Sequence, residues 1–432
     1  MPGQDTSAYN EVLKNVFEGG IRELIPTKVK TLRKFEEKDA KAWGGRYVEY
    51  PLLVGRNWGS GWGTELGNLP TAGREQYTST KIFMRYQYGR IQLSAQVMKA
   101  SQGSRYAFAP AMEQAMRGIV NTMSSERGRA IMGDGRGIMC LVNETTPSGN
   151  TTVVVDSPGG FAGADNGARF VNPGMVIGFV NPTTGALRAS NRTVQSVATA
   201  GTSFVVDSAP AAATADNDYI VRVMTTGSTD VSDSSYQKEM MGLSGLIDDG
   251  TYVGTLHAVN RITYPIYQST VITSAGAWSS DVIQRAIDLA DQRGGGTINS
   301  LTMHHSGRRA YIASMEDLRR YSGADLSRPD GGTVAAKMGK LTFGGIPIDE
   351  EKYCPYGVVF GVDDSTFKRY VEVAGEWADE DGSILQRVGT GSSAQDAYEA
   401  FYRIWDNTAV EEPATCFRVD GLSVSLAVAH ID

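Results

Sequence analysis

YAFAPAMEQAMRGIVNTMSSERGRAIMGD, residues 106–134, is the longest helical pattern in the chain. Pro110 suits the first turn of a helix, where a missing N–H costs little, and Gly133 is a typical stop. At 1.5 Å per residue, residues 110–132 predict a helix about 35 Å long. This helix suits either the core of an ordinary domain or a long support in an assembly. Its apolar residues recur at helical spacing in one stripe, made of Met112, Met116, Ile119, Val120 and Met123.

The length and the amino-acid composition suggest a multidomain protein that is not a dedicated DNA binder. A length of 432 residues predicts two to four domains. With 41 Lys and Arg against 48 Asp and Glu, the net charge is -7, whereas duplex-DNA binders are normally basic. The 50 glycines indicate many turns and much β structure.

Cysteine usage and hydropathy point to a protein of the cytoplasm. Cys140, Cys354 and Cys416 are scattered without any CxxC pair, so we expect buried thiols and no disulfide framework. The first residues do not resemble a secretory signal, and no run of 18 apolar residues exists. We therefore expect no membrane contact.

A long two-stranded loop is expected before the helix. Residues 46–53 and 80–94 alternate like strands, and the stretch 55–79 between them is rich in glycine. Trp58 and Trp62 lie in a setting too polar for a core, so a neighbouring subunit is expected to cover them. A flexible loop with both indoles folded back on their own domain is the alternative. The candidate intersubunit contacts are Trp58, Trp62, Arg56, Glu65, Arg74, Lys81 and Arg85.

Residues 145–225 form a separate block rich in Thr, Val, Gly, Ala and Asn. No lysine occurs from Gln102 to Gln237. The segments TTVVVDS, 151–157, and TSFVVDS, 202–208, resemble each other and indicate two similar strands. The spacing predicts about six short strands in a small all-β module.

Mixed structure follows the β block. WSSDVIQRAIDLADQRG predicts a helix with Ser279 or Ser280 as N-cap and Gly294 as stop. INSLTMHHS, 298–306, reads as a strand, and a second helix is expected over 307–321. Asp248 and its neighbour Asp249 read as turn or cap residues. Short strands with Gly and Pro turns complete the chain, which indicates an α/β or α+β fold.

Catalytic and cofactor motifs are missing. The glycine-rich stretches 59–63 and 133–137 lack the Lys-Ser or Lys-Thr of a phosphate loop, and 242–245 does not complete a GxSxG elbow. His304 and His305 are adjacent, so in a strand they would point to opposite faces and could not share a metal. We expect no enzyme, no cofactor and no metal site.

Taken in order, the parts resemble the major capsid protein of tailed bacteriophages, with the Hong Kong 97-like coat fold. AQVMKASQGSRYAFAPAMEQAMRGIVNTMSSERGRAIMGDGRG, from residue 95, resembles the family's spine helix and its Gly-Asp-Gly exit. LTFGGIPIDEEKYCPYGVVFGVDDSTF, from residue 341, resembles its strands with Gly-x-Pro and Gly-Asp turns.

The resemblance implies an α+β Hong Kong 97-like phage capsid fold with an inserted small all-β domain. It assigns an N-terminal arm, an extended loop, a peripheral domain with the spine helix, an inserted β-barrel-like domain, a mainly axial domain and closing strands. Their respective bounds are residues 1–43, 44–95, 96–144, 145–225, 226–352 and 353–432. Lys81 and Asn57 lie in the loop, but without a matching acidic catalyst we do not predict a Lys–Asn crosslink.

The implied function is self-assembly as pentamers and hexamers into an icosahedral phage head enclosing double-stranded DNA. The implied partners are further copies of the chain, a separate scaffolding protein, a portal and weakly bound DNA, with a decoration protein left open. The protein would be made in the host cytoplasm and reside in the virion. An encapsulin-like nanocompartment shell and a β-rich glycan-binding or adhesive protein are the alternatives.

Overall fold

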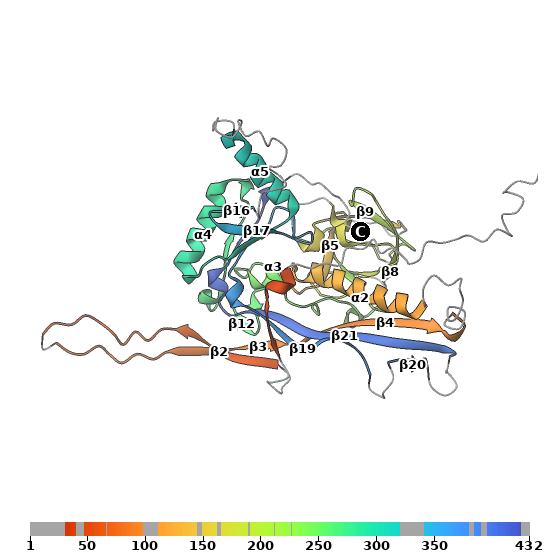
Figure 1. Cartoon of the computed structure of the whole chain (residues 1–432), viewed down its shortest axis with the longest axis horizontal. Helices are drawn as coiled ribbons and strands as arrows, with labels where there is room; N and C mark the ends of the chain where they lie inside the picture. The colour runs from red at the N-terminus through yellow and green to blue at the C-terminus, as the bar shows by residue number, and fades with distance from the viewer. Residues whose placement is uncertain are drawn as a thin grey trace, which may run out of the picture. The chain divides into compact units, whose positions relative to one another are not determined.

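The chain divides into two compact units. The first comprises Tyr88–Ser124 and Glu376–Arg403 among the described residues, and the second takes most of the remainder. Helix α2 and strands β4, β19 and β21 continue from one unit into the other along the chain (Figure 1). The predicted arm, 1–43, lies outside the described residues except for 31–39. The structure, a computed structural model, describes residues 31–39, 47–65, 67–97, 111–144, 149–161, 166–188, 191–210, 212–225, 227–319, 341–379, 384–389 and 395–424.

The long helix expected at 110–132 is α2, Ala111–Ala130, and it begins directly after Pro110. Met123 is buried, whereas Met116, Ile119 and Val120 are half-buried, and the side chain of Met112 lies outside the described residues. The stripe packs on β4, Arg85–Ser94, at Gly89. A Cβ on Gly89 would lie 2.4 Å from the Met123 sulfur and 2.7 Å from Ile119 Cγ1, so only glycine allows this approach.

The expected two-stranded loop is the hairpin of β2, Tyr47–Gly55, and β3, Gln76–Phe83, which run side by side in Figure 1. They pair antiparallel from Tyr47↔Phe83 outward. The prediction of one continuous strand over 80–94 was wrong. The pairing ends before Met84, which is buried in a cluster under the hairpin, and β4 then joins a different sheet.

The sheet that receives β4 has five strands in the order β1-β19-β21-β20, with β4 paired to β21. β1 pairs parallel with the start of β19. The long β21 ends in a run of buried residues that belong to the second unit. The closing strands that the sequence predicted therefore include two long members of this sheet. The bounds are β1 Glu36–Asp39, β19 Phe367–Trp377, β20 Gln386–Arg387 and β21 Ala397–Val410.

The lysine-free block folds into a closed six-stranded barrel in the order β10-β5-β6-β9-β8-β7. Its first strand begins at Ile138, so the barrel starts before the predicted boundary at residue 145. The two similar segments form β6 and β9, which pair with each other at Val153↔Phe204. The strands are β5 Ile138–Val142, β6 Thr152–Asp156, β7 Val176–Val180, β8 Arg192–Val197, β9 Ser203–Val206 and β10 Tyr219–Arg222.

The barrel shares one hydrophobic core with the rest of the second unit. Buried barrel residues such as Phe179 and Phe204 belong to the same cluster as Leu246 and Phe360 outside it. Arg169, just before β7, is buried and donates from Nη1 to the Cys354 carbonyl at 3.0 Å. The barrel is thus built into this unit and is not a separately packed module.

The two remaining long helices pack against a second sheet, which has six strands. Its order is β13-β22-β18-β15-β17-β16. α4, Ser280–Gly294, is capped by Ser279, whose side chain accepts the Asp281 N–H at 3.2 Å. The left-handed C-cap is Gly295, and Gly294 is the last helical residue instead of the stop. The strands are β13 Thr270–Ile272, β15 Ser300–Met303, β16 Thr342–Phe343, β17 Ile346–Glu350, β18 Val359–Val362 and β22 Phe417–Val419.

The second helix of this part starts earlier than predicted. α5 covers His305–Arg319, so His304 and His305 lie after β15 and not within a strand. His304 Nδ1 accepts the Ser306 N–H at 3.1 Å and so satisfies a free donor at the start of α5. Other short elements, besides several 3-10 turns, include η1 Thr31–Lys34, α3 Leu243–Leu246, β11 Thr255–Leu256, β12 Val259–Asn260, β14 Gly276–Ala277 and β23 Leu422–Ser423.

The structure also shows the state of the three cysteines and the hydropathy of the helices. Cys140, Cys354 and Cys416 are buried free thiols, as predicted. Among the helices in the described ranges, none is long and apolar enough to cross a membrane.

Candidate assembly surface

The connection between β2 and β3 carries the most exposed apolar side chains of the described chain. Trp58 is 82% exposed, Leu69 is 90% exposed, and Trp62 is completely exposed. The alternative in which both indoles fold back on their own domain is therefore wrong for this structure. On the strands, Leu53 and Tyr77 are directly paired across the hairpin, and both are exposed. The hairpin thus presents an apolar surface that the described part of the chain leaves uncovered.

The connection is narrow because its two arms touch at glycines. A Cβ on Gly59 would lie 2.7 Å from the Gly73 nitrogen, so neither position has room for a side chain. Asn57 Oδ1 accepts the Gly59 N–H at 2.8 Å, and the Thr64 carbonyl accepts the Gly67 N–H at 3.0 Å. With its arms this close, the loop offers the indoles no interior to enter.

The base of the hairpin is anchored in a small core. Val48, Ile82 and Met84 are buried against Tyr370 of β19 and Ala409 of β21. Tyr50 packs against the same cluster, and its carbonyl accepts the Thr80 hydroxyl at 3.0 Å. Burial raises the pKa of the Tyr50 hydroxyl far above its ordinary value. An exposed apolar ribbon on a buried base is a geometry suited to contact with another molecule.

Three polar contacts fix the end of the hairpin to the body of the second unit. The Lys81 N–H donates to the His257 carbonyl at 2.8 Å. Asn407 Nδ2 donates to the Phe83 carbonyl at 2.8 Å, and Arg85 Nη1 donates to the Gln237 carbonyl at 2.8 Å. Desolvation lowers the pKa of the Arg85 guanidinium.

The seven predicted contact residues occupy different environments. Arg56, Glu65 and Arg74 are exposed along the same connection as the two tryptophans. Lys81 is half-buried on β3, with its ammonium 5.4 Å from the centre of the Tyr47 ring. Arg85 lies on β4, where the contact to Gln237 already engages its guanidinium. The sequence reasoning missed Leu69, Leu53 and Tyr77, although the alternation of β2 and β3 could have indicated the latter two.

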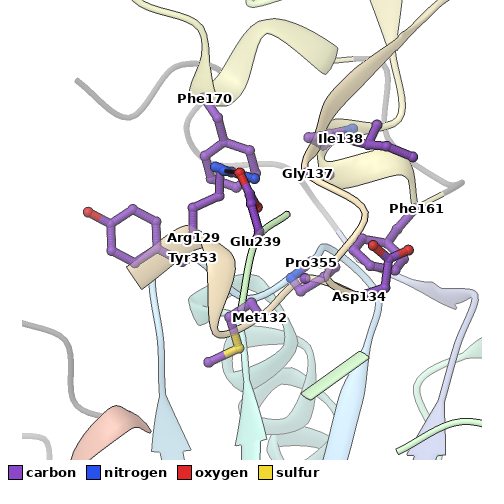
Figure 2. Close-up of a pocket in the computed structure, with 13 residues that line it drawn as sticks. Arg129, Met132, Asp134, Gly137, Ile138, Phe161, Phe170, Glu239, Tyr353 and Pro355 are labelled. Atoms are coloured by element: carbon purple, nitrogen blue, oxygen red, sulfur yellow. Dashed lines mark hydrogen bonds and ion pairs between the residues drawn. The ribbon is translucent and has the colours of Figure 1, made fainter. Parts of the chain in front are cut away.

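A small pocket lies where α2 leads into the barrel (Figure 2). Arg129 and Glu239 form an ion pair at this pocket, and Asp134, Phe161 and Tyr353 also line it. Its volume is about 10 Å³, which is room for one water at most. Ligand pockets usually measure hundreds of Å³, so this space does not suit a substrate.

His304 and Ser306 could be mistaken for a base and a nucleophile, because His304 Nδ1 and Ser306 Oγ are 2.8 Å apart. Both residues are buried, and the ring caps α5 as described above. Burial, with Arg169 nearby, lowers the pKa of His304 to about 3, so the ring is neutral. Within the described ranges, no group of three His, Cys, Asp or Glu residues is placed to hold a metal. The arrangement supports a structural role for these histidines.

Comparison with known proteins gives matches only in structure. No protein-family model matches the sequence, and no curated protein matches it by sequence. The cyanophage A-1(L) capsid asymmetric unit matches with a TM-score of 0.56 at 10% identity, covering 96% of this chain and 99% of that chain. The capsid of the native GTA particle matches with a TM-score of 0.48 at 10% identity, covering 98% and 100%.

The holo-SrpI encapsulin complex from Synechococcus elongatus PCC 7942 matches with a TM-score of 0.44 at 9% identity, covering 99% of this chain and 98% of that chain. Among these three, the cyanophage match is the one strong enough to carry an argument about fold. It extends over nearly the whole of both chains. The chain has an α+β fold of the Hong Kong 97-like capsid type, as its sequence predicted.

Proposed function

We propose that the chain is a major capsid protein that self-assembles as pentamers and hexamers into an icosahedral phage head. The observation that carries this proposal is the match to the cyanophage A-1(L) capsid chain over 96% of this chain. At 10% identity the match supports the fold, and the exposed hairpin supports the step from fold to assembly.

The hairpin tip is the proposed contact between subunits. Trp58, Trp62 and Leu69 are large apolar side chains on a narrow ribbon, and a second copy of the chain would cover them. Arg56, Glu65 and Arg74 lie on the same ribbon and would supply the polar rim. A ribbon that reaches from each copy to the next makes a heterologous contact, which closes into rings when the rotation allows.

The remaining parts of the proposal follow from charge and site chemistry. A net charge of -7 suits a container that encloses double-stranded DNA through weak, non-specific contacts. A separate scaffolding protein and a portal are the proposed helpers of assembly, and the virion is the proposed location. We propose no enzymatic activity, since the described residues place the His304–Ser306 pair out of reach of a substrate.

Electron microscopy and sedimentation of the expressed chain, with and without its scaffolding protein, test the proposal. The wild type should form uniform shells or tubes. The double variant Trp58→Ala, Trp62→Ala should remain as small oligomers with an unchanged urea-unfolding midpoint, because both indoles lie outside the core. Met224→Ala removes another exposed apolar side chain, 65% exposed at the end of the barrel, and should assemble like the wild type.

A wild-type chain that stays monomeric under all these conditions would refute the proposal. The contents of purified shells separate the two kinds of container, since double-stranded DNA supports a phage head and packaged protein supports a nanocompartment. An adhesive, glycan-binding role is not proposed, because the barrel that suggested it shares its core with the rest of the unit.

A further inference from the structure

The short β11–β12 hairpin turns through two residues with an unfavourable backbone. His257 and Ala258 have φ angles of 48° and 68°. Two-residue turns of this kind normally use Asn or Gly, because a Cβ in the left-handed region costs free energy. Such residues persist where the surrounding structure holds them in place, often at sites that switch.

The contacts that hold this turn come from the base of the β2–β3 hairpin. The His257 carbonyl accepts the Lys81 N–H of β3. The Gln237 carbonyl accepts a bond from Arg85, and Gln237 also has a positive φ, of 58°. Two non-glycine residues in the left-handed region therefore supply the acceptors for residues 81–85, which link the hairpin to β4.

The His257 ring lies in an environment that opposes a positive charge. The residue is 9% exposed, and its Nε2 has no hydrogen-bond partner among the residues that the structure describes. The ring bonds to the Thr408 backbone of β21, while Arg261 after β12 and Arg85 of β4 add positive charge. Burial, followed by these two cations, lowers the pKa of His257 to about 3. On the β3 side, the Lys81 ammonium lies over the Tyr47 ring.

We propose that the β11–β12 turn is an acid-sensitive latch, opened by protonation of His257, that holds the base of the β2–β3 hairpin. Protonation in place would create an N–H that lacks an acceptor among the described residues, and its positive charge would be repelled by Arg261 and Arg85. Opening hydrates the ring and relaxes the His257 and Ala258 backbone, and the Lys81 N–H at the base of the hairpin then loses its carbonyl acceptor. The latch belongs to the chain itself and does not depend on the proposed capsid function.

The direction and size of the effect follow from proton linkage. In the open state the ring takes its ordinary pKa of about 6.5, so the open state binds more protons than the closed state as pH falls. Between pH 7.5 and pH 5.5 the open population should rise about tenfold. The rest of the fold should remain closed over this range.

Hydrogen exchange on the full chain at pH 7.5 and 5.5, corrected for intrinsic exchange rates, tests the latch. In the wild type, the opening of residues 76–85 should increase about tenfold at pH 5.5, whereas β9 of the barrel should remain protected at both pH values. His257→Asn should abolish this response, because Asn tolerates the left-handed backbone and does not titrate. His305→Asn is the matched control, since the exposed His305 bonds to Glu350, and it should respond like the wild type.

Equal protection of residues 76–85 at both pH values in the wild type would overturn the latch, as would an unchanged response in His257→Asn. Ala258→Gly supplies a second variant if the first does not fold. Glycine removes the strain at φ 68°, so opening should decrease at both pH values while the tenfold ratio persists. Unchanged opening in Ala258→Gly would contradict a strained latch.

Discussion

Arg127, near the end of α2, donates from Nη1 to Oδ1 of Asp406 in β21 at 3.0 Å, and its Nη2 donates to the other carboxylate oxygen. Arg369 of β19 donates from Nε to the same carboxylate at 2.7 Å. Arg127 is 7% exposed, Asp406 is 2% exposed, and Arg369 is as buried as Arg127. One buried carboxylate therefore joins the end of α2 to two strands of the long sheet.

Replacing this carboxylate should destabilise the second unit strongly. Asp406→Asn removes the counter-charge of the buried Arg127 guanidinium and leaves Arg369 with the exposed carboxylate of Glu37. Breaking a buried ion pair in this way typically costs about 3–5 kcal/mol. Urea unfolding followed by circular dichroism measures the loss. The exposed pair of Arg403 and Glu376 supplies the control, since Glu376→Gln should cost less than about 1 kcal/mol. Equal effects of the two variants would contradict the role given to Asp406.

Replacing either of two glycines of the first unit by alanine should change the stability of the protein, in opposite directions for the two positions. Gly89→Ala inserts a Cβ against Met123 and Ile119, and such overpacking costs about 1–3 kcal/mol. Gly118 lies within α2, and apart from the helix's own backbone no atom of the described residues comes within 4 Å of an added Cβ, so Gly118→Ala should stabilise by about 0.5–1 kcal/mol. Thermal unfolding measures both. A stable Gly89→Ala variant would refute close packing of α2 on β4.

Acid should weaken the fold through His304. The pKa of His304 in the folded state, about 3, is below the ordinary value of 6.5, so the unfolded chain binds a proton first as pH falls. The stability of the fold is therefore undiminished by this residue above pH 6.5 and is lost progressively as pH falls toward 3. Between pH 7 and 5 this loss amounts to about 2 kcal/mol. His304→Asn keeps a capping acceptor without titrating. Between pH 7 and pH 5, the free energy of unfolding of this variant, measured in urea, should fall by about 2 kcal/mol less than that of the wild type. An equal fall in both proteins would exclude this effect of His304.

The three thiols should not react in the folded chain. Burial raises the pKa of Cys140, Cys354 and Cys416, the last to about 11, and thiolates are the reactive form. Ellman's reagent at pH 8 should therefore label none of them natively and all three in urea. Thr183→Cys places a thiol on an exposed barrel turn and should react at once. Rapid labelling of the folded wild type would contradict this prediction and show that the core around the thiols opens.

Local signals allowed the helices to be predicted within a few residues. α4 follows from Ser279 as N-cap and from apolar residues at helical spacing, both of which act within one or two turns. Pro110 likewise marks the start of α2. The hairpin was predictable because a glycine-rich stretch with two tryptophans separates two alternating segments.

Long-range contacts explain what the sequence could not show. The alternation of β3 continues into β4, so the break at Met84 appears only once the cluster beneath the hairpin is formed. β5 was missed as a barrel strand because the predicted boundary at residue 145 followed the change in composition, whereas the pairing of β5 with β6 and with β10 appears only in the folded barrel. Asp248 does accept N–H bonds of its own turn, as predicted, from Gly250, Tyr252 and Val253.

The same Asp248 is also completely buried, and it pairs with Arg418 at 3.0 Å and with Arg261 at 3.6 Å. Each of these arginines donates further bonds to backbone carbonyls, including Ser244 and Gly245. Charged residues lie at the surface of proteins as a rule. This network departs from the rule because folding brings together partners that are distant in sequence, which the sequence alone does not show.

The barrel lies entirely within the stretch that contains no lysine, so none of its strands carries a primary amine. Dyes, crosslinkers and polymers that couple to amines will therefore attach elsewhere on the chain. A single lysine introduced at an exposed barrel turn, such as Thr183→Lys, would give that face one addressable coupling point. If the chain forms a shell, the same substitution would repeat this point once in every copy.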